Sequence, residues 1–326
     1  MLFREITKSH GVSKTSVPPI PYIHNLMLTN HDEIAMPLRL ALITHTRNET
    51  NARQKQHQNH TLHLNENTDF SIIIISFEPE LKKPETYLDL IDGWVLLVDK
   101  PITWTSFDVV NKLKGHLKGL KKVQPEEWRD RNVKIGHAGT LDPLATGLLV
   151  VCVGKKTKEL DQLQTGVKTY TGTIHMGQTT PSYDLETTPT GNFEFENLTI
   201  DDYQKVAQSF LGEQWQTPPV FSAKQINGKR AYEFAREGIE VEMKKSWIEI
   251  FDFQITRCQP PEIDFEITCS KGTYIRTIAH EFGQRLNSGS YLQNLRRTKS
   301  LPFDVKDAIS VDEWCDFFWK WKNLEK

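Results

Sequence analysis

The chain has 326 residues, of which 38% are hydrophobic and 25% charged, and a formal net charge of −2 at pH 7. This composition is typical of a soluble globular protein. It contains no apolar run of the roughly 18 residues needed to span a membrane, and no secretory signal. The cysteines form no close pair and indicate neither a zinc site nor disulfides: Cys152, Cys258, Cys269 and Cys315. We therefore expect a cytoplasmic protein without membrane contact or a metal.

Residues 1–88 differ in composition from the rest of the chain. They contain seven of the eleven histidines, many Asn and Thr, and no sustained helical or strand period. His57, His60 and His63 lack the Cys or carboxylate partners expected of a metal site. We therefore expect a poorly ordered polar extension, followed by one folded domain over residues 89–326.

The first predicted elements flank a polar loop. Residues 93–98 read as a buried strand, and Ser106 as the N-cap of a helix. One stripe of that helix is apolar: Val109, Val110, Leu113, Leu117 and Leu120. Residues 135–154 read as a short strand, a tight loop and a strand covered on both faces. A further strand is predicted at 168–176.

The second half of the chain mixes strands and helices. A helix is expected to begin at Thr199 or Asp201, with four residues facing inward: Tyr203, Val206, Phe210 and Leu211. A short helix at 230–236 follows a turn. The strands 247–255 and 263–269 alternate apolar and polar residues and should pair antiparallel across two prolines. A helix within 273–283, a strand at 292–301 and a helix at 311–322 complete an α+β fold with mostly antiparallel strands.

The loop of residues 136–147 contains one carboxylate, that of Asp142. Pro143 restricts Asp142 to extended backbone angles, and glycines on both sides permit close approach. A rigid loop of this kind suits a nucleophile or a base, although Asp-Pro is also an ordinary turn. The chain contains no phosphate loop, no Gly-x-Gly-x-x-Gly leading from a strand into a helix, no Gly-x-Ser-x-Gly and no His-Glu-x-x-His.

Positive charge is concentrated in four short clusters. Each cluster alone reads as a solvated face, but together they would form a surface that follows phosphates. The clusters are Lys118, Lys121 and Lys122; Lys155, Lys156 and Lys158; Lys224, Lys229 and Arg230; and Arg296, Arg297 and Lys299.

Residues 136–149, Gly-His-Ala-Gly-Thr-Leu-Asp-Pro-Leu-Ala-Thr-Gly-Leu-Leu, resemble the catalytic-loop motif of the TruB family of tRNA pseudouridine synthases. Further matches follow in the family's order: Asp99-Lys100-Pro101, Lys168-Thr169-Tyr170, Tyr183-Asp184, Ser222-Ala223-Lys224, residues 270–277 and residues 295–298. The resemblance covers about 91–305. It implies the pseudouridine synthase fold, a mixed and mostly antiparallel central sheet flanked by helices, with an insertion near 213–245 that grips the T-arm.

The resemblance implies an isomerase that converts uridine-55 in the T-loop of tRNA to pseudouridine without any cofactor. Asp142 matches the family's nucleophile, which either attacks the sugar carbon or assists glycal formation. Arg276 matches the arginine that pairs with it. Tyr170 matches the tyrosine that stacks on the flipped base and is a proposed proton acceptor from carbon 5. Five positions match residues that fill, line or approach the substrate pocket: His137, Tyr274, Leu295, Lys100 and Asp184.

Two departures from the family pattern leave the RNA target open. Thr103 stands where the family usually has glycine, and Thr179-Thr180-Pro181 replaces a usual Arg-Thr-Asp. The chain ends soon after the last motif, so we expect a bacterial-type member without the C-terminal PUA domain, acting as a monomer on the T-arm. The alternatives are a synthase for another RNA with a T-loop-like fold, and a catalytically silent RNA-binding or RNA-folding protein.

Overall fold

The computed structural model describes residues 83–226 and 228–324. Its strands are β1 (Trp94–Lys100), β2 (Ile135–Ala138), β3 (Ala145–Val153), β4 (Lys168–Met176), β5 (Gly212–Gln216), β6 (Gln225–Ile226), β7 (Lys229–Arg230), β8 (Ser246–Gln259), β9 (Glu262–Cys269), β10 (Ser290–Ser300), β11 (Phe303–Asp304) and β12 (Ile309–Ser310). Its helices are α1 (Tyr87–Asp92), α2 (Ser106–Lys121), α3 (Glu126–Arg129), α4 (Leu160–Gln164), α5 (Ile200–Gln208), α6 (Ala231–Arg236), α7 (Ile275–Arg285) and α8 (Val311–Leu324), with 3₁₀ turns η1 (Gly154–Glu159) and η2 (Val305–Asp307).

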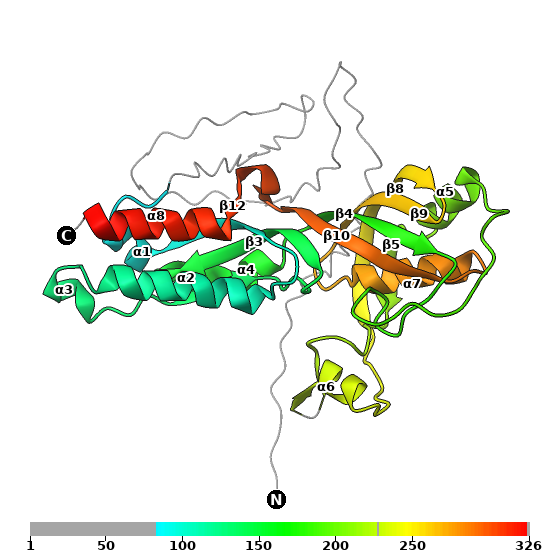
Figure 1. Cartoon of the computed structure of the whole chain (residues 1–326), viewed down its shortest axis with the longest axis horizontal. Helices are drawn as coiled ribbons and strands as arrows, with labels where there is room; N and C mark the ends of the chain where they lie inside the picture. The colour runs from blue at the N-terminus through cyan, green and yellow to red at the C-terminus, as the bar shows by residue number, and fades with distance from the viewer. Residues whose placement is uncertain (1–82, 227, 325–326) are drawn as a thin grey trace, which may run out of the picture. The chain divides into compact units, whose positions relative to one another are not determined.

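Ten of these strands form one mixed sheet (Figure 1). The main order is β12-β1-β3-β10-β4-β9-β8-β5, with β2 added to β3 and β11 to β10. Two pairs are parallel, β1 with β12 and β10 with β3. Every other pair in this sheet is antiparallel. The predicted α+β class with a mostly antiparallel sheet is therefore confirmed.

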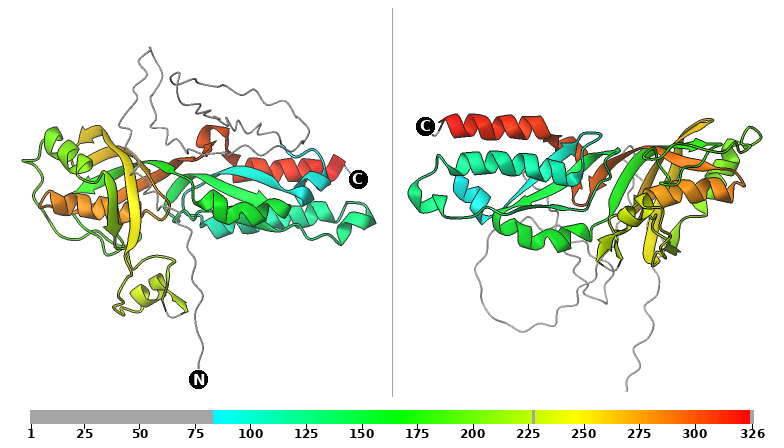
Figure 2. Two further views of the ribbon diagram at one scale, coloured as in Figure 1. Left: turned by 180° about the vertical axis from the view of Figure 1, so that it is seen from behind. Right: turned by 60° about the horizontal axis from the view of Figure 1, so that its bottom comes forward.

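Strand β3 is buried on both faces, as its unbroken apolar run predicts. On one face, Leu149 and Val151 pack with the apolar stripe of α2 and with Phe318 of α8. On the other face, Leu148 and Val150 belong to a separate cluster against which α4 packs. Helices α2 and α8 lie side by side over this part of the sheet (Figure 2).

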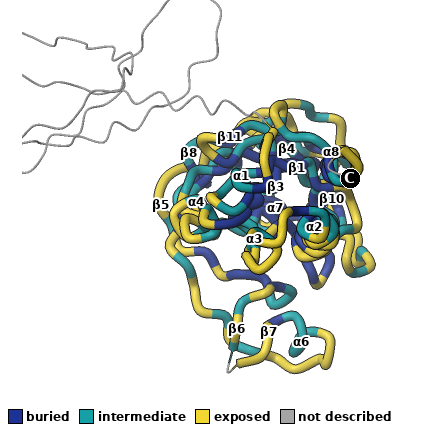
Figure 3. Tube along the Cα trace, turned by 90° about the vertical axis from the view of Figure 1, so that its left-hand side faces the viewer, coloured by how far each residue is buried: buried dark blue, intermediate teal, exposed yellow. Residues whose placement is uncertain are grey.

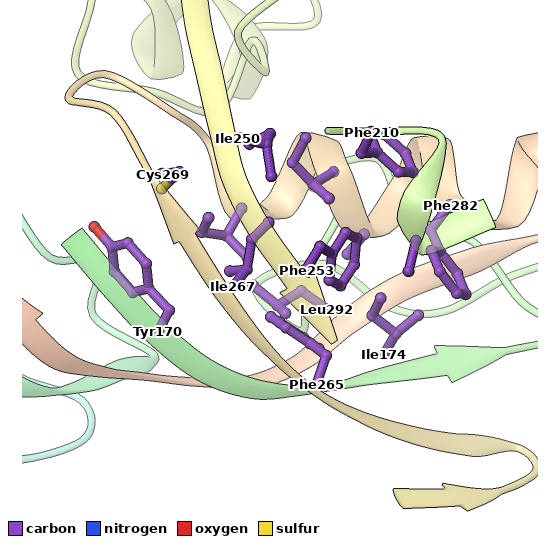
Figure 4. Close-up of a cluster of buried hydrophobic side chains, with 14 of the residues drawn as sticks. Tyr170, Ile174, Phe210, Ile250, Phe253, Phe265, Ile267, Cys269, Phe282 and Leu292 are labelled. Atoms are coloured by element: carbon purple, nitrogen blue, oxygen red, sulfur yellow. The ribbon is translucent and has the colours of Figure 1, made fainter. Parts of the chain in front are cut away.

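A second core lies under the strands β4, β8, β9 and β10. Phe253 and Phe265 from two neighbouring strands pack against Phe282 of α7 (Figure 4). Tyr170 lies at the edge of this cluster, and its hydroxyl points away from the apolar side chains. Because β10 pairs with both β3 and β4, it joins the two halves of the sheet.

Residues 217–245 leave the sheet between β5 and β8. They contain the β6–β7 hairpin and α6, which stand apart from the rest and have mostly exposed or half-buried residues (Figure 3). Lys224 Nζ donates to Lys244 O at 3.3 Å and to Ser246 Oγ at 2.6 Å. This side chain therefore ties the two ends of the excursion together. The sheet strand β5 was not predicted, and it moves the start of the excursion from 213 to 217.

Several expectations need correction. The folded part begins before residue 89, because α1 buries Tyr87 and Leu90. The N-cap of α2 is Thr105, whose side chain accepts from the backbone of Asp108, and Ser106 is the first helical residue. Residues 1–82 of the predicted extension lie outside the described residues.

Near α5 the prediction was partly wrong. Thr199 caps the helix, and Tyr203 and Phe210 are buried as expected. Leu211, however, is 40% exposed, because the helix ends at Gln208 and the following residues turn toward β5. The predicted strand at 168–176, helix at 230–236 and C-terminal helix are confirmed.

Candidate active site

The loop that carries Asp142 rests on the segment leading into α2. The Thr103 N–H donates to Pro143 O at 2.8 Å, and the Leu141 N–H donates to Ser106 Oγ at 2.8 Å. Because backbone groups on both sides of Asp142 are bound, the loop is held in one shape. The Asp142 side chain remains 40% exposed and can reach a bound molecule.

Arg276, in the first turn of α7, lies against Asp142. Its Nε is 2.9 Å from Asp142 Oδ2, and its side chain is only 4% exposed. A second carboxylate oxygen, Asp184 Oδ2, lies 3.6 Å from the same nitrogen. Arg276 also donates to Ser182 O at 3.3 Å. One buried cation thus serves two carboxylates, of which only Asp142 is open to solvent.

The short segment around Asp184 is docked on α7. Tyr183 has φ +65°, and its ring stacks on His280 with centroids 3.9 Å apart. Asp184 Oδ1 accepts from the Glu186 N–H at 3.0 Å. Burial raises the pKa of Asp184, and the charge of Arg276 opposes that shift. This carboxylate is therefore less readily ionised than an exposed aspartate.

Lys100 is fully buried at the end of β1. Its Nζ donates to Pro101 O at 3.0 Å and to Pro143 O at 3.4 Å. Burial lowers the pKa of Lys100 to about 8, while the nearby Asp142 charge acts in the opposite direction. Lys100 therefore stabilises the Asp142-Pro143 turn through a hydrogen bond to the Pro143 carbonyl.

Tyr170 lies on β4, between Arg297 on β10 and Ile267 on β9. Its side chain is buried, and burial raises its pKa, against the effect of the Arg297 charge. The charge of Asp142 also raises the pKa of this phenol.

The pocket-lining residues expected from the sequence occupy both sides of the Asp142 loop. Leu295 pairs in register with Ala145 on β3 and packs against the second core. The Tyr274 backbone is held at both ends by the Gln216 side chain, at 2.8 and 3.1 Å. The charges of Asp142 and Arg276 act on the Tyr274 phenol, whose pKa burial raises.

His137 lies on β2, opposite Val151 of β3. Burial lowers its pKa, as does the nearby Arg297 charge. Within the described residues, no hydrogen bond or ion pair joins His137 to Asp142. The structure thus brings Asp142, Arg276 and Asp184 into direct contact, while His137 lies at the start of the loop.

Sequence reasoning missed Arg297. It was grouped with Arg296 and Lys299 as a surface cluster, but it is 1% exposed and binds the backbone carbonyls of Gly139 and Leu148 on either side of Asp142. The one available signal was its place in strand 292–301, where alternate residues face opposite ways. The cluster of Lys155, Lys156 and Lys158 is partly neutralised at the surface, since Lys155 pairs with Asp92 and Lys156 with Glu159.

In the described part of the chain, no group of three or more His, Cys, Asp or Glu side chains is arranged to hold a metal ion. None of the helices described there has the length and apolar character that crossing a membrane would require.

Comparison with known proteins gives consistent matches. Residues 127–275 match the family model described as TruB family pseudouridylate synthase (N terminal domain). The tRNA pseudouridine synthase B of Flavobacterium johnsoniae is 51% identical over 70% of this chain and 96% of its own length. That of Chloroherpeton thalassium is 46% identical over 68% of this chain and 89% of its own.

Among solved structures, a chain of a Cbf5-Nop10-Gar1 complex superposes with a TM-score of 0.54 at 24% identity. The match covers 73% of this chain and 58% of that one. At this identity the likeness concerns the fold alone, and it agrees with the sheet and helices described above.

Proposed function

Because the chain belongs to the TruB family of pseudouridylate synthases, we propose that it isomerises uridine-55 in the T-loop of tRNA to pseudouridine, with Asp142 as the nucleophile. The observation that carries the proposal is the contact between the half-exposed Asp142 carboxylate and the buried Arg276 guanidinium. The relatives named tRNA pseudouridine synthase B support tRNA as the substrate class.

The reaction breaks the bond between N1 of uracil and C1′ of ribose and forms a bond from C5 to C1′. The proton on C5 is lost and N1 gains one, so product and substrate are isomers. Asp142 acts as an anion, by attack on C1′ or by assisting glycal formation. Arg276 stabilises this charge, because an opposite charge in direct contact favours the ionised carboxylate.

The uridine must leave its stack before chemistry, at a cost of a few kcal/mol. Tyr170 and Leu295 offer ring and apolar surface on the neighbouring strands β4 and β10, of which β10 pairs with β3. We assign Tyr170 to stacking on the flipped base and to accepting the C5 proton. Tyr274 and Leu295 line the pocket, and His137 fills the space that the base leaves.

Lys100 and Asp184 support the reacting groups from buried positions. Lys100 holds the Pro143 carbonyl and adds positive charge beneath Asp142. Asp184 shares Arg276 with Asp142 and keeps the guanidinium in place. In this proposal the folded part of the chain, from α1 onward, acts as a monomeric catalytic domain.

The excursion at 217–245 is proposed to grip the T-arm. Lys229 and Arg230 are exposed on the hairpin, although Arg230 also donates to Ala223 O at 2.7 Å. Lys224 is a support rather than an RNA contact, since its ammonium is used within the excursion.

The proposal is tested by incubating the full chain with an unmodified tRNA transcript and locating pseudouridine at nucleotide resolution. We expect modification at position 55, and none in a transcript carrying cytidine there. Modification at another position only, or of another T-loop-like RNA in preference, would contradict the target. Binding of tRNA without any isomerisation would identify the silent RNA-binding protein instead.

A further inference from the structure

Arg297 occupies the centre of the sheet beneath the proposed site. On β10 it lies opposite Tyr170 of β4 and beside Gly147, the residue where the catalytic loop has joined β3. A Cβ on Gly147 would lie 2.3 Å from the Arg297 carbonyl oxygen, so only glycine permits this approach. The backbone geometry therefore brings Arg297 between the loop and Tyr170.

The guanidinium binds both ends of the loop that carries Asp142. Its Nε donates to Leu148 O at 2.7 Å, and its NH2 nitrogen donates to Gly139 O at 3.2 Å. Gly139 precedes Asp142 and Leu148 follows it, so one planar group fixes the width of the loop. The compact ammonium of a lysine lacks this planar fork of donors.

Arg297 is 1% exposed, and within residues 83–226 and 228–324 no carboxylate forms an ion pair with it. Its neighbour Arg296, by contrast, is bidentate to Asp99 at 3.0 and 2.6 Å. A buried cation without a carboxylate partner is unfavourable for stability alone. Such a group is expected where negative charge develops during a reaction.

The side chain beside Arg297 that gains negative charge is Tyr170. Burial raises the pKa of this phenol, and the charge of Arg297 and a hydrogen bond from it act in the opposite direction. The Tyr170 hydroxyl also points away from the apolar cluster (Figure 4). Arg297 is therefore placed to stabilise a Tyr170 phenolate.

We propose that Arg297 is a positioning residue that stabilises the Tyr170 phenolate for removal of the C5 proton and holds the Asp142 loop open to the base. This inference rests on the proposed function. In the step concerned, the phenolate oxygen takes the proton from C5, and the C–H electrons restore the C5–C6 double bond. The electrons of the C6–N1 double bond pass to N1, which takes a proton from solvent.

The experiment compares Arg297→Gln and Arg297→Lys with the unaltered enzyme on tRNA carrying hydrogen or deuterium at C5 of uridine-55. Losing the phenolate's partner slows proton removal specifically. The deuterium effect on kcat should therefore at least double in Arg297→Gln and be intermediate in Arg297→Lys. In the unaltered enzyme kcat should rise at alkaline pH as Tyr170 ionises. In Arg297→Gln this rise should move to higher pH. The neighbouring Arg296→Gln is the matched control and should change neither.

If kcat falls in both variants while the isotope effect and the pH profile stay unchanged, Arg297 has only a structural role. That result would overturn the inference. If neither variant folds, the unaltered enzyme is titrated by phenolate absorbance against Tyr170→Phe and Tyr203→Phe. Tyr170 should ionise before Tyr203, whose pKa burial raises to about 12; the reverse order overturns the inference. Failure of the proposed function is distinct, because the unaltered enzyme would then form no pseudouridine at position 55.

Discussion

Arg276 Nε lies 2.9 Å from Asp142 Oδ2, and the Arg276 side chain is 4% and the Asp142 side chain 40% exposed. The two side chains come from distant parts of the chain: Asp142 lies in the loop before β3, and Arg276 lies in the first turn of α7. Because the cation is buried and the anion is half-exposed, the carboxylate can meet a substrate without losing its partner.

Arg276→Ala should lower kcat by at least about 100-fold, since removing a preorganised electrostatic partner of a reacting group typically costs about 10²–10³ in kcat. Steady-state rates on tRNA between pH 6 and 8 measure the loss. Arg276→Lys keeps the charge and should recover part of the rate. A rate unchanged across neutral pH would refute the pairing.

Thr103→Gly should stabilise the fold by about 1 kcal/mol. Thr103 has φ +72°, which a β-branched residue adopts only under strain. Release of roughly 1–3 kcal/mol of strain exceeds the extra backbone entropy that glycine loses on folding. Urea unfolding measures the change. Thr105→Ala, which removes the cap of α2, should instead destabilise by about 1 kcal/mol. Destabilisation by Thr103→Gly would show that the threonine is not strained.

Lys168 should contribute more to the free energy of unfolding as the pH rises from 8 to 10. Burial lowers the pKa of Lys168 to about 8 from an ordinary 10.5, so the unfolded chain binds more protons between those values. The unfolding free energy therefore increases with pH in that window. The measurement is urea unfolding of the unaltered protein and of Lys168→Met at pH 8 and pH 10. The difference in unfolding free energy, unaltered minus variant, should be larger at pH 10. The exposed Lys114→Met should show no such trend, and a decrease at Lys168 would contradict the sign.

Lys229→Gln should raise KM for tRNA several-fold and leave kcat unchanged. Lys229 is exposed on the excursion, where it would meet a phosphate. The slope of log affinity against log salt should fall by about one. The exposed acidic Glu240→Gln on the same excursion is the control and should not raise KM. A fall in kcat at constant KM would place Lys229 in the chemistry instead.

Local patterns were enough to predict much of the fold. The apolar run of β3 and the stripe of α2 carry strong periodic signals, and both are buried as expected. The strand β5 has only five residues and no alternation, so its pairing with β8 could not be foreseen. Leu211 was misplaced because the end of α5 is decided by tertiary contacts rather than by its own helical pattern.

The candidate site shows the same division. The family motifs predicted the pairing of Asp142 with Arg276, and the two side chains are in contact. The burial of Lys100 and Arg297 was missed, because a basic residue in a strand looks the same in sequence whether it faces solvent or backbone carbonyls. Only the packing of several strands distinguishes the two cases.

The most direct test of the central claim is release of tritium from tRNA labelled at C5 of uridine-55, comparing the unaltered enzyme with Asp142→Asn. The substitution keeps the shape of the side chain and removes the anion that the reaction needs. The unaltered enzyme should release the label with multiple turnovers, whereas Asp142→Asn should bind the tRNA and release none. Release by Asp142→Asn at near the unaltered rate would contradict Asp142 as the nucleophile.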